Sequence, residues 1–206
     1  ALVQKRTGNE PVRVWVPGCS TGEEVYSLAI ALKESVAEDS VPIRVFATDV
    51  DEEAIQEARA GRYPKTVSEY VSPERLRRFF VERRDEYQIA KSVRDMCVFA
   101  GQNVLTDPPF SRIDLIACRT LLLSLDLFLQ RRVLPLLHHA LRPSGFLVLG
   151  RSGTIGALAD LFETVDARHR IYSKKEVATP TLAVPLPASA RERLGRPRLQ
   201  SSDGGV

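Results

Sequence analysis

A short glycine-containing loop near the start of the chain carries two acidic residues, and its composition suits a cationic ligand. Residues 16–24 read Val-Pro-Gly-Cys-Ser-Thr-Gly-Glu-Glu and join a predicted strand to a predicted helix. Glycines at 18 and 22 allow the backbone to turn tightly and to approach a ligand closely. Glu23 and Glu24 place negative charge where a bound phosphate would need positive potential, so they favour a ligand that carries an amino group.

The spacing of the same loop differs from the common phosphate-binding motifs. No Gly-Lys-Ser/Thr follows Gly22, so the loop is not a P-loop. The gap from Gly18 to Gly22 does not fit the Gly-x-Gly-x-x-Gly of dinucleotide-binding proteins, which argues against a nicotinamide dehydrogenase. The ligand is therefore not expected to present a phosphate here.

Asp49 is the second informative residue, because it ends the second predicted strand. In nucleotide-binding α/β folds an acid at this position hydrogen-bonds the ribose hydroxyls. Together, the glycine loop, its acids and Asp49 predict a ligand made of an adenosine and an amino acid, and S-adenosylmethionine fits this description. The alternative is structural: Glu23 and Glu24 would interact with the helix dipole, and Asp49 would cap the helix that begins at Glu52.

The elements that must position these residues alternate between strand and helix, which indicates a mainly parallel sheet covered on both faces. We predict strands at 12–16, 45–47, 96–100, 113–117 and 146–149, helices at 23–34, 52–60, 73–81 and 127–141, and a closing antiparallel pair at 162–165 and 170–173. Gly61 is a suitable C-cap for the second helix, and residues 142–145 are expected to connect the last helix to its strand.

Length and composition fit one globular domain. The chain has 206 residues, of which 44% are hydrophobic and 27% charged, and this excludes disorder throughout. We expect a lead-in at 1–11, a domain over 12–176 in which residues 62–95 could form a small inserted subdomain, and a Pro/Arg-rich linker or disordered tail at 177–206.

Several partners and compartments are disfavoured. No apolar run approaches the roughly 20 residues of a membrane-spanning helix, and a net charge of +3 does not by itself indicate a nucleic-acid ligand. The three cysteines, Cys19, Cys97 and Cys118, lack metal-ligand spacing and cannot all pair. We therefore expect no metal, no nucleic acid, no membrane insertion and a reducing, cytoplasmic compartment.

Taken in order, these motifs resemble those of CheR-type chemotaxis receptor methyltransferases. Residues 14–27 read Val-Trp-Val-Pro-Gly-Cys-Ser-Thr-Gly-Glu-Glu-Val-Tyr-Ser, and the similarity continues at 46–51, 102–105, 114–119, 141–147 and 171–174. The resemblance covers about residues 12–175. It implies a Rossmann-like class I methyltransferase fold and transfer of a methyl group from S-adenosylmethionine to glutamate side chains on the cytoplasmic domain of a chemoreceptor.

The resemblance also implies roles for single residues. Around the glycine loop with Gly18, Glu24 would meet the methionine amino group with Glu23 beside it, Asp49 would hold the ribose, Asn103 and Val104 would flank the adenine, and Arg119 and Thr120 would lie near the methionine end and the substrate carboxylate. Arg119 is the catalytic candidate, because its cation could orient that carboxylate. No general base is required, since a methyl sulfonium is already activated and a glutamate is already anionic near neutral pH.

The chain departs from the family pattern in three places. The family usually has Cys-Arg-Asn followed four residues later by Tyr, whereas Thr120 and Ser124 stand at those positions here. Only residues 1–11 precede the first strand, where the family has an N-terminal helical domain, so further domains are expected in the full-length chain. Residues 82–86 lack the glycine of members that dock a receptor tail peptide, so that docking is not expected. The alternative function is a catalytically inactive, S-adenosylmethionine-binding or protein-interaction domain of a larger signalling protein.

Overall fold

The structure, a computed structural model, describes residues 10–36, 41–150 and 155–180. Residues 1–9 of the expected lead-in over 1–11, and residues 181–206 of the expected tail over 177–206, lie outside the described residues. In chain order the elements are β1 (Val12–Pro17), α1 (Glu23–Ser35), β2 (Ile43–Asp49), α2 (Glu52–Ala60), β3 (Arg62–Pro64), η1 (Lys65–Glu69), α3 (Pro73–Phe79), β4 (Phe80–Glu82), β5 (Glu86–Ile89), α4 (Lys91–Arg94), β6 (Cys97–Gly101), β7 (Ile113–Ala117), α5 (Leu121–Ser124), α6 (Leu127–Ala140), β8 (Leu141–Val148), η2 (Gly156–Leu161), β9 (Phe162–Asp166) and β10 (Ile171–Lys174).

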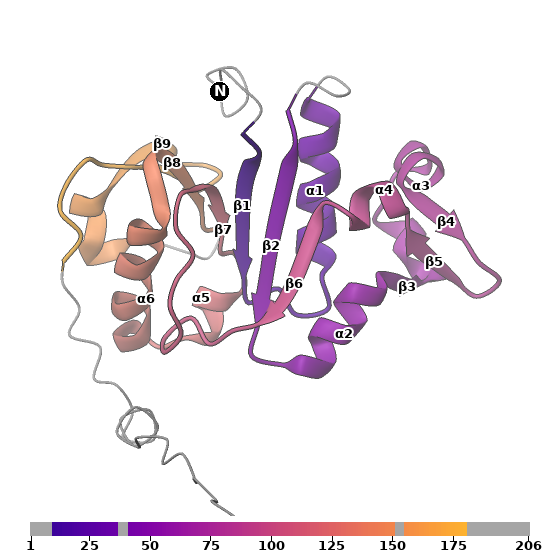
Figure 1. Ribbon diagram of the computed structural model, residues 1–206, viewed down its shortest axis with the longest axis horizontal. Coiled ribbons are helices and arrows are strands. Elements are labelled where there is room, and N and C mark those ends of the chain that lie inside the picture. The colour runs from indigo at the N-terminus through magenta and orange to yellow at the C-terminus, as the bar shows by residue number, and fades with distance from the viewer. Residues whose placement is uncertain (1–9, 37–40, 151–154, 181–206) are drawn as a thin grey trace, which may run out of the picture.

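A seven-stranded sheet with the order β6-β2-β1-β7-β8-β10-β9 forms the centre of the fold (Figure 1). The first five of these strands are parallel, and β10 runs antiparallel to both of its neighbours. This topology confirms the expected mainly parallel sheet with a closing antiparallel pair. Since strand order reverses at β1, the carboxyl ends of β1 and β7 meet at a switch point, where ligands bind in open α/β sheets.

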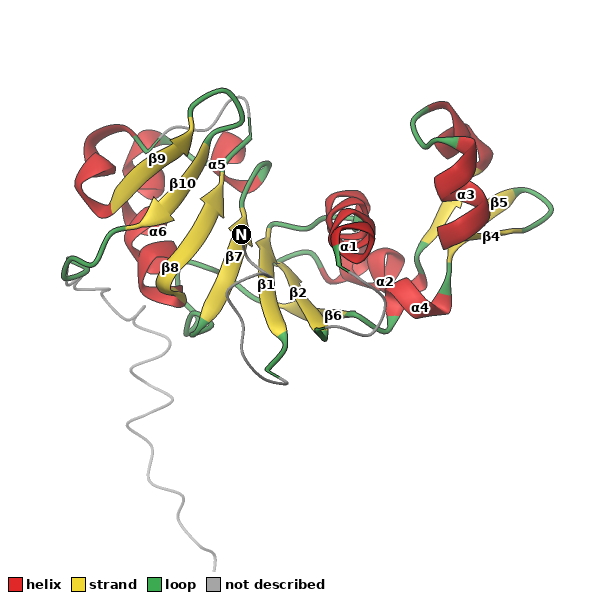
Figure 2. Ribbon diagram, turned by 90° about the horizontal axis from the view of Figure 1, so that it is seen from above, coloured by secondary structure: helices red, strands yellow, loops and turns green. Residues whose placement is uncertain are grey.

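Two hydrophobic cores hold helices against opposite faces of this sheet (Figure 2). Val25, Tyr26 and Ala29 of α1 are buried in one core, and Val133 and Leu137 of α6 are buried in the other. The strand order accounts for this arrangement: β1 to β2 and β7 to β8 progress in opposite directions across the sheet, so crossovers of the same hand place their helices on opposite faces. In each helix the apolar side chains recur at helical spacing, so they form one stripe that packs against the sheet.

Most boundaries shift by one or two residues from the sequence prediction, and in two places the type of element also changes. The predicted helix over 73–81 ends at Phe79, because residues 80–82 form β4 and pair with β5, Phe80 lying opposite Ile89. Residues 142–145 belong to strand β8, which starts directly after α6 and pairs Leu141 with Ile113 before its register shifts. In both cases pairing with another strand decides the conformation.

A second, three-stranded sheet with the order β3-β5-β4 lies beyond α2 and α4, at the right of Figure 1. It contacts the glycine loop through one side chain: the Tyr63 hydroxyl on β3 donates to the Thr21 carbonyl at 2.9 Å. Burial raises the pKa of Tyr63 far above its ordinary value, so this phenol remains protonated and able to donate.

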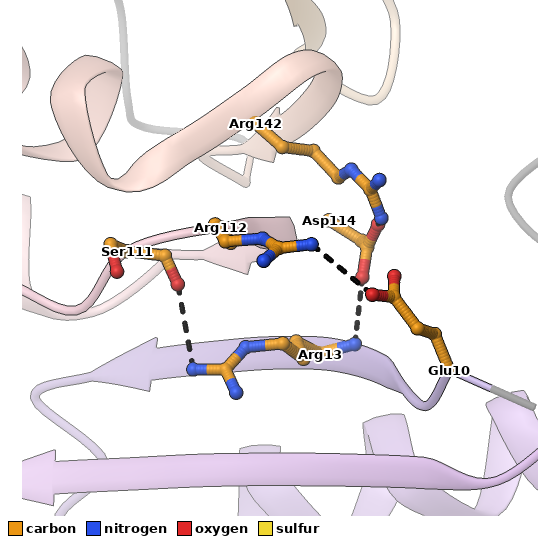
Figure 3. Close-up of polar contacts among 6 residues, drawn as sticks. All are labelled: Glu10, Arg13, Ser111, Arg112, Asp114 and Arg142. Carbon is orange, nitrogen blue, oxygen red and sulfur yellow. Dashed lines mark hydrogen bonds and ion pairs between the residues drawn. The ribbon is translucent and has the colours of Figure 1, made fainter.

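A polar network joins β1, β7 and β8 at the sheet edge opposite the glycine loop (Figure 3). The buried Asp114 carboxylate accepts the Arg13 backbone N–H at 2.8 Å and pairs with Nη1 of Arg142 at 3.0 Å. Beside it, Arg112 pairs with Glu10 at 3.1 Å. The network sets the relative positions of the strands whose opposite ends form the site.

No helix in the described part of the chain has the length and apolar character needed to cross a membrane.

Candidate cofactor and methyl-acceptor site

The glycine loop after β1 has backbone φ angles that most residue types other than glycine rarely adopt. Gly18, Ser20 and Gly22 have φ angles of 68°, 47° and 91°. A Cβ on Gly18 would lie 2.8 Å from Cβ of Leu121, so α5 packs directly against the bare backbone. The N–H groups of Gly18 and Cys19 both donate to the Thr48 carbonyl, at 2.7 and 3.0 Å. Loop, α5 and the end of β2 therefore form one fixed surface.

Asp49 at the end of β2 contacts this loop directly. Its Oδ2 accepts the Ser20 N–H at 2.8 Å, and its Oδ1 accepts the Asp51 N–H at 3.1 Å. The helix α2 is capped by Asp51, whose side chain accepts from the N–H groups of residues 53 and 54. The alternative role of Asp49 as that cap is therefore wrong. Each Asp49 oxygen retains a second lone pair for a further donor.

Glu24, in the first turn of α1, is a half-buried carboxylate with spare acceptor capacity. Its side chain is 15% exposed, and its Oε1 accepts no hydrogen bond from any described residue. Arg119 Nε lies 3.8 Å from Oε1, and the Thr120 hydroxyl lies 3.5 Å from Oε2. Burial raises the pKa of Glu24, and Arg119 and Thr120 oppose this only in part. A half-buried carboxylate with a buried oxygen that accepts no hydrogen bond fits an ammonium group of a ligand.

Two cavities meet at Glu24. One of about 640 Å³ is lined by the glycine loop, Glu23, Glu24, Arg119 and Thr120. The other, of about 420 Å³, shares Glu24, Ser27, Arg119 and Gly150 with the first. Its far wall comes from the ends of β7 and β8 and from Arg168 and His169 in the turn between β9 and β10. The two adjoining cavities provide room for a cofactor beside a second substrate.

Several of the predicted site residues are thus brought together, and others lie apart. Gly18, Glu23, Glu24, Arg119 and Thr120 line the larger cavity, and Asp49 contacts it through Ser20. Asn103 and Val104 line neither cavity: the Asn103 side chain accepts the Leu105 N–H, and Val104 is buried in the α6-side core.

Gly150, Arg168 and His169 are among the lining residues that sequence reasoning missed. Gly150 has a φ of 68°, and a Cβ there would lie 3.1 Å from the Arg119 side chain, so this glycine leaves space for that arginine. The position of Gly150 just beyond β8 was a usable signal, because all parallel strands end at the same sheet edge. No motif marked the β9–β10 turn. Among the described residues, no cluster of His, Cys, Asp and Glu is placed to hold a metal ion.

Comparisons with known proteins identify a family and several relatives. The family model described as CheR methyltransferase, SAM binding domain, matches residues 1–171. The protein named "Uncharacterized 104.1 kDa protein in hypE 3'region" of Rhodobacter capsulatus is 38% identical over 173 residues, which is 83% of this chain and 18% of that protein. The chemotaxis protein methyltransferase 1 of Pseudomonas aeruginosa is 29% identical, over 78% of this chain and 61% of that protein. The chemotaxis protein methyltransferase of Vibrio parahaemolyticus is also 29% identical, over 84% of this chain and 65% of its own length.

The chain therefore spans less than two thirds of each of these relatives. Among solved structures, a TehB-like SAM-dependent methyltransferase from Corynebacterium glutamicum aligns over 84% of this chain and 85% of its own, with a TM-score of 0.48 and 15% identity.

Proposed function

The chain belongs to the CheR methyltransferase family, and from this we propose that it transfers the methyl group of S-adenosylmethionine to glutamate side chains of a chemoreceptor-type protein. The observation that carries the proposal is the half-buried Glu24 carboxylate, whose buried Oε1 accepts no hydrogen bond from any described residue and which stands where the two cavities meet. It suits the α-amino group of the cofactor, and no phosphate needs to be accommodated beside it.

We infer the following roles for the cofactor side of the site. Glu24 would bind the ammonium group, with Glu23 adding negative potential beside it, and the bare backbone at Gly18 would let the cofactor approach the loop. Asp49 would accept from the ribose hydroxyls with its remaining lone pairs. For Asn103 and Val104, which follow β6 but line neither cavity, the role of flanking the adenine rests on the family resemblance alone.

When bound, S-adenosylmethionine supplies a positively charged sulfonium whose methyl group is ready for transfer. The protein then has to hold a glutamate oxygen in line with that methyl group and keep water away from it. Arg119 would orient the acceptor carboxylate, because it is 59% exposed and lies at the boundary of both cavities. Its contact with Glu24 limits how strongly it can neutralise the nucleophile.

The methyl acceptor and compartment follow from the same proposal. Relatives named chemotaxis protein methyltransferase support an acceptor in the cytoplasmic domain of a chemoreceptor-like protein, and hence a cytoplasmic location.

A second candidate function is cofactor or partner binding without turnover. The observation in its favour is that Ser124, which stands where the family usually has Tyr, donates its hydroxyl to the Leu121 carbonyl at 2.8 Å. This hydroxyl is thus used inside α5 and lines neither cavity. Thr120 at the neighbouring family position keeps a hydroxyl near Glu24 but lacks an amide.

Calorimetric titration with S-adenosylmethionine and S-adenosylhomocysteine tests the cofactor site. Glu24→Gln and Asp49→Ala should each weaken binding, Glu24→Gln by about 30-fold, because a hydrogen bond to a charged group contributes roughly 2 kcal/mol. Glu57→Gln, at an exposed site on α2, is the matched control and should bind like the wild type. Full-strength binding by both site variants would exclude this cofactor position.

Methyl transfer from radiolabelled S-adenosylmethionine to a chemoreceptor cytoplasmic fragment then separates the two functions. Label that is released by base as methanol identifies a methyl ester and supports the proposed reaction. Tight cofactor binding without any labelled fragment would favour the non-catalytic function instead.

A further inference from the structure

Resting on the proposed function, we propose that the turn between β9 and β10 recognises the methyl acceptor, and that Arg168 binds a carboxylate of an acidic segment in that acceptor. The turn comprises residues 167–170 and lies at the carboxyl end of β8, because Ile171 pairs with Val148. It therefore stands at the same sheet edge as the glycine loop and Arg119.

The cavity next to this turn has the composition of an anion site. Arg119, Arg168 and His169 line it, and Glu24 is its only acidic lining residue among those the structure describes. In the proposed complex, the cofactor's ammonium group would balance Glu24, which leaves the arginines as the uncompensated charges. A carboxylate would thus be attracted to this cavity.

Arg168 is available for such a contact. Within the described part of the chain, no carboxylate lies within 4.0 Å of its guanidinium, whereas Arg119 already faces Glu24 at 3.8 Å. The two side chains line one cavity of about 420 Å³. One carboxylate at Arg119 and a neighbouring one at Arg168 would orient an acceptor segment rich in acidic residues.

The turn itself holds Arg168 in place. The Asp166 carboxylate accepts the backbone N–H of His169 at 3.0 Å with Oδ1, and its Oδ2 lies 2.7 Å from His169 Nδ1. These hydrogen bonds also lower the pKa of Asp166. Arg170 completes the turn with a left-handed φ of 54°. Asp166 and His169 are therefore positioning residues, and Arg168 is the residue that would touch the acceptor.

The inference also predicts a preference between substrate and product. A glutamate is anionic, whereas its methyl ester is neutral and loses the attraction of both arginines. The cavity should therefore hold the unmethylated segment more tightly than the methylated one, which favours product release.

A binding experiment tests the inference apart from turnover. The probes are a synthetic glutamate-rich helical peptide and its counterpart with glutamine at every glutamate, each titrated into the chain saturated with S-adenosylhomocysteine. The wild type should bind the glutamate peptide and not the glutamine peptide. Arg168→Ala should weaken that binding about 10-fold, since charge-assisted hydrogen bonds contribute roughly 1.5 kcal/mol.

Two further variants control for charge and location. Arg168→Lys keeps the cation and should retain most of the affinity. Arg131→Ala removes the same charge from an exposed position on α6, across the sheet, and should bind within about 2-fold of the wild type.

Equal binding by Arg168→Ala and the wild type would overturn the inference, and so would failure of the wild type to bind the glutamate peptide. The S-adenosylhomocysteine titration of the same samples reports on the proposed function independently. Intact cofactor binding with no effect at Arg168 would leave the proposed function standing and remove only the role of the turn.

Discussion

Replacing Gly18 by alanine should destabilise the chain and weaken cofactor binding together. The substitution creates two separate penalties. The first is the backbone, because φ at Gly18 is 68°, a region that costs L-residues about 1–2 kcal/mol. The second is steric, because the new Cβ would lie 2.8 Å from Cβ of Leu121, and overpacking of this kind costs roughly 1–3 kcal/mol.

The sum of these terms is about 2–5 kcal/mol in the free energy of unfolding. For a domain of this size, each kcal/mol shifts Tm by roughly 2–4 °C, so we expect Tm to fall by about 4–20 °C. The clash can be relieved only by moving the loop or α5, both of which line the proposed cofactor cavity. The Kd for S-adenosylmethionine should therefore rise in the same variant.

Gly156 provides a matched control for this reasoning. It also has a positive φ, 47°, but a Cβ there would meet nothing within 4 Å. Gly156→Ala should therefore carry only the backbone penalty, about 1–2 kcal/mol, and leave cofactor affinity unchanged. Urea unfolding and calorimetry on both variants measure the difference. Equal losses of stability in the two variants would refute the claim that Leu121 packs against the bare backbone.

Three further predictions concern single groups. Asp114→Asn should lower the free energy of unfolding by about 1–3 kcal/mol in urea melts, because it removes one charge of a buried ion pair while its Arg13 contact can persist; unchanged stability would show that the network is not needed. Since the pKa of Glu24 is raised in the folded chain, its ionised form is a cost above that pKa, so Glu24→Gln should be at least as stable as the wild type at neutral pH, with the difference shrinking as pH falls towards the ordinary value of 4.5. A gap in Tm that widens on acidification would contradict this sign. Burial raises the pKa of each thiol to about 12, so Cys19, Cys97 and Cys118 should resist alkylation at pH 8 until denaturant is added, and rapid labelling of the native chain would oppose the described burial.

Local sequence signals predicted much of the fold correctly. The sequence predicted both boundaries of α2. The helix begins at Glu52 and ends before Gly61, which adopts the left-handed conformation of a C-cap as predicted. The strand–loop–helix order around Gly18 and Glu24 followed equally from apolar periodicity and turn residues. These features depend on neighbours within a few residues, so the sequence contains enough information to predict them.

Contacts between different elements could not be predicted from such local signals. The sequence left the role of Asp49 open between ribose binding and helix capping, and only the structure showed that Asp51 caps α2 while Asp49 contacts Ser20. Phe80 was assigned to a helix because its strand partner, Ile89, lies across a turn that local pattern does not reveal.

The sequence by itself determined that a glycine loop with two acids follows the first strand, that an aspartate ends the second, and that the sheet is mainly parallel. Only the tertiary structure decided that Arg119 meets Glu24, that Gly150 leaves space for that arginine, and that Arg168 closes the neighbouring cavity. The physical reason is the order of the strands. Parallel strands bring their carboxyl ends to one edge whatever their separation along the chain, and which ends become neighbours depends on packing of the whole sheet.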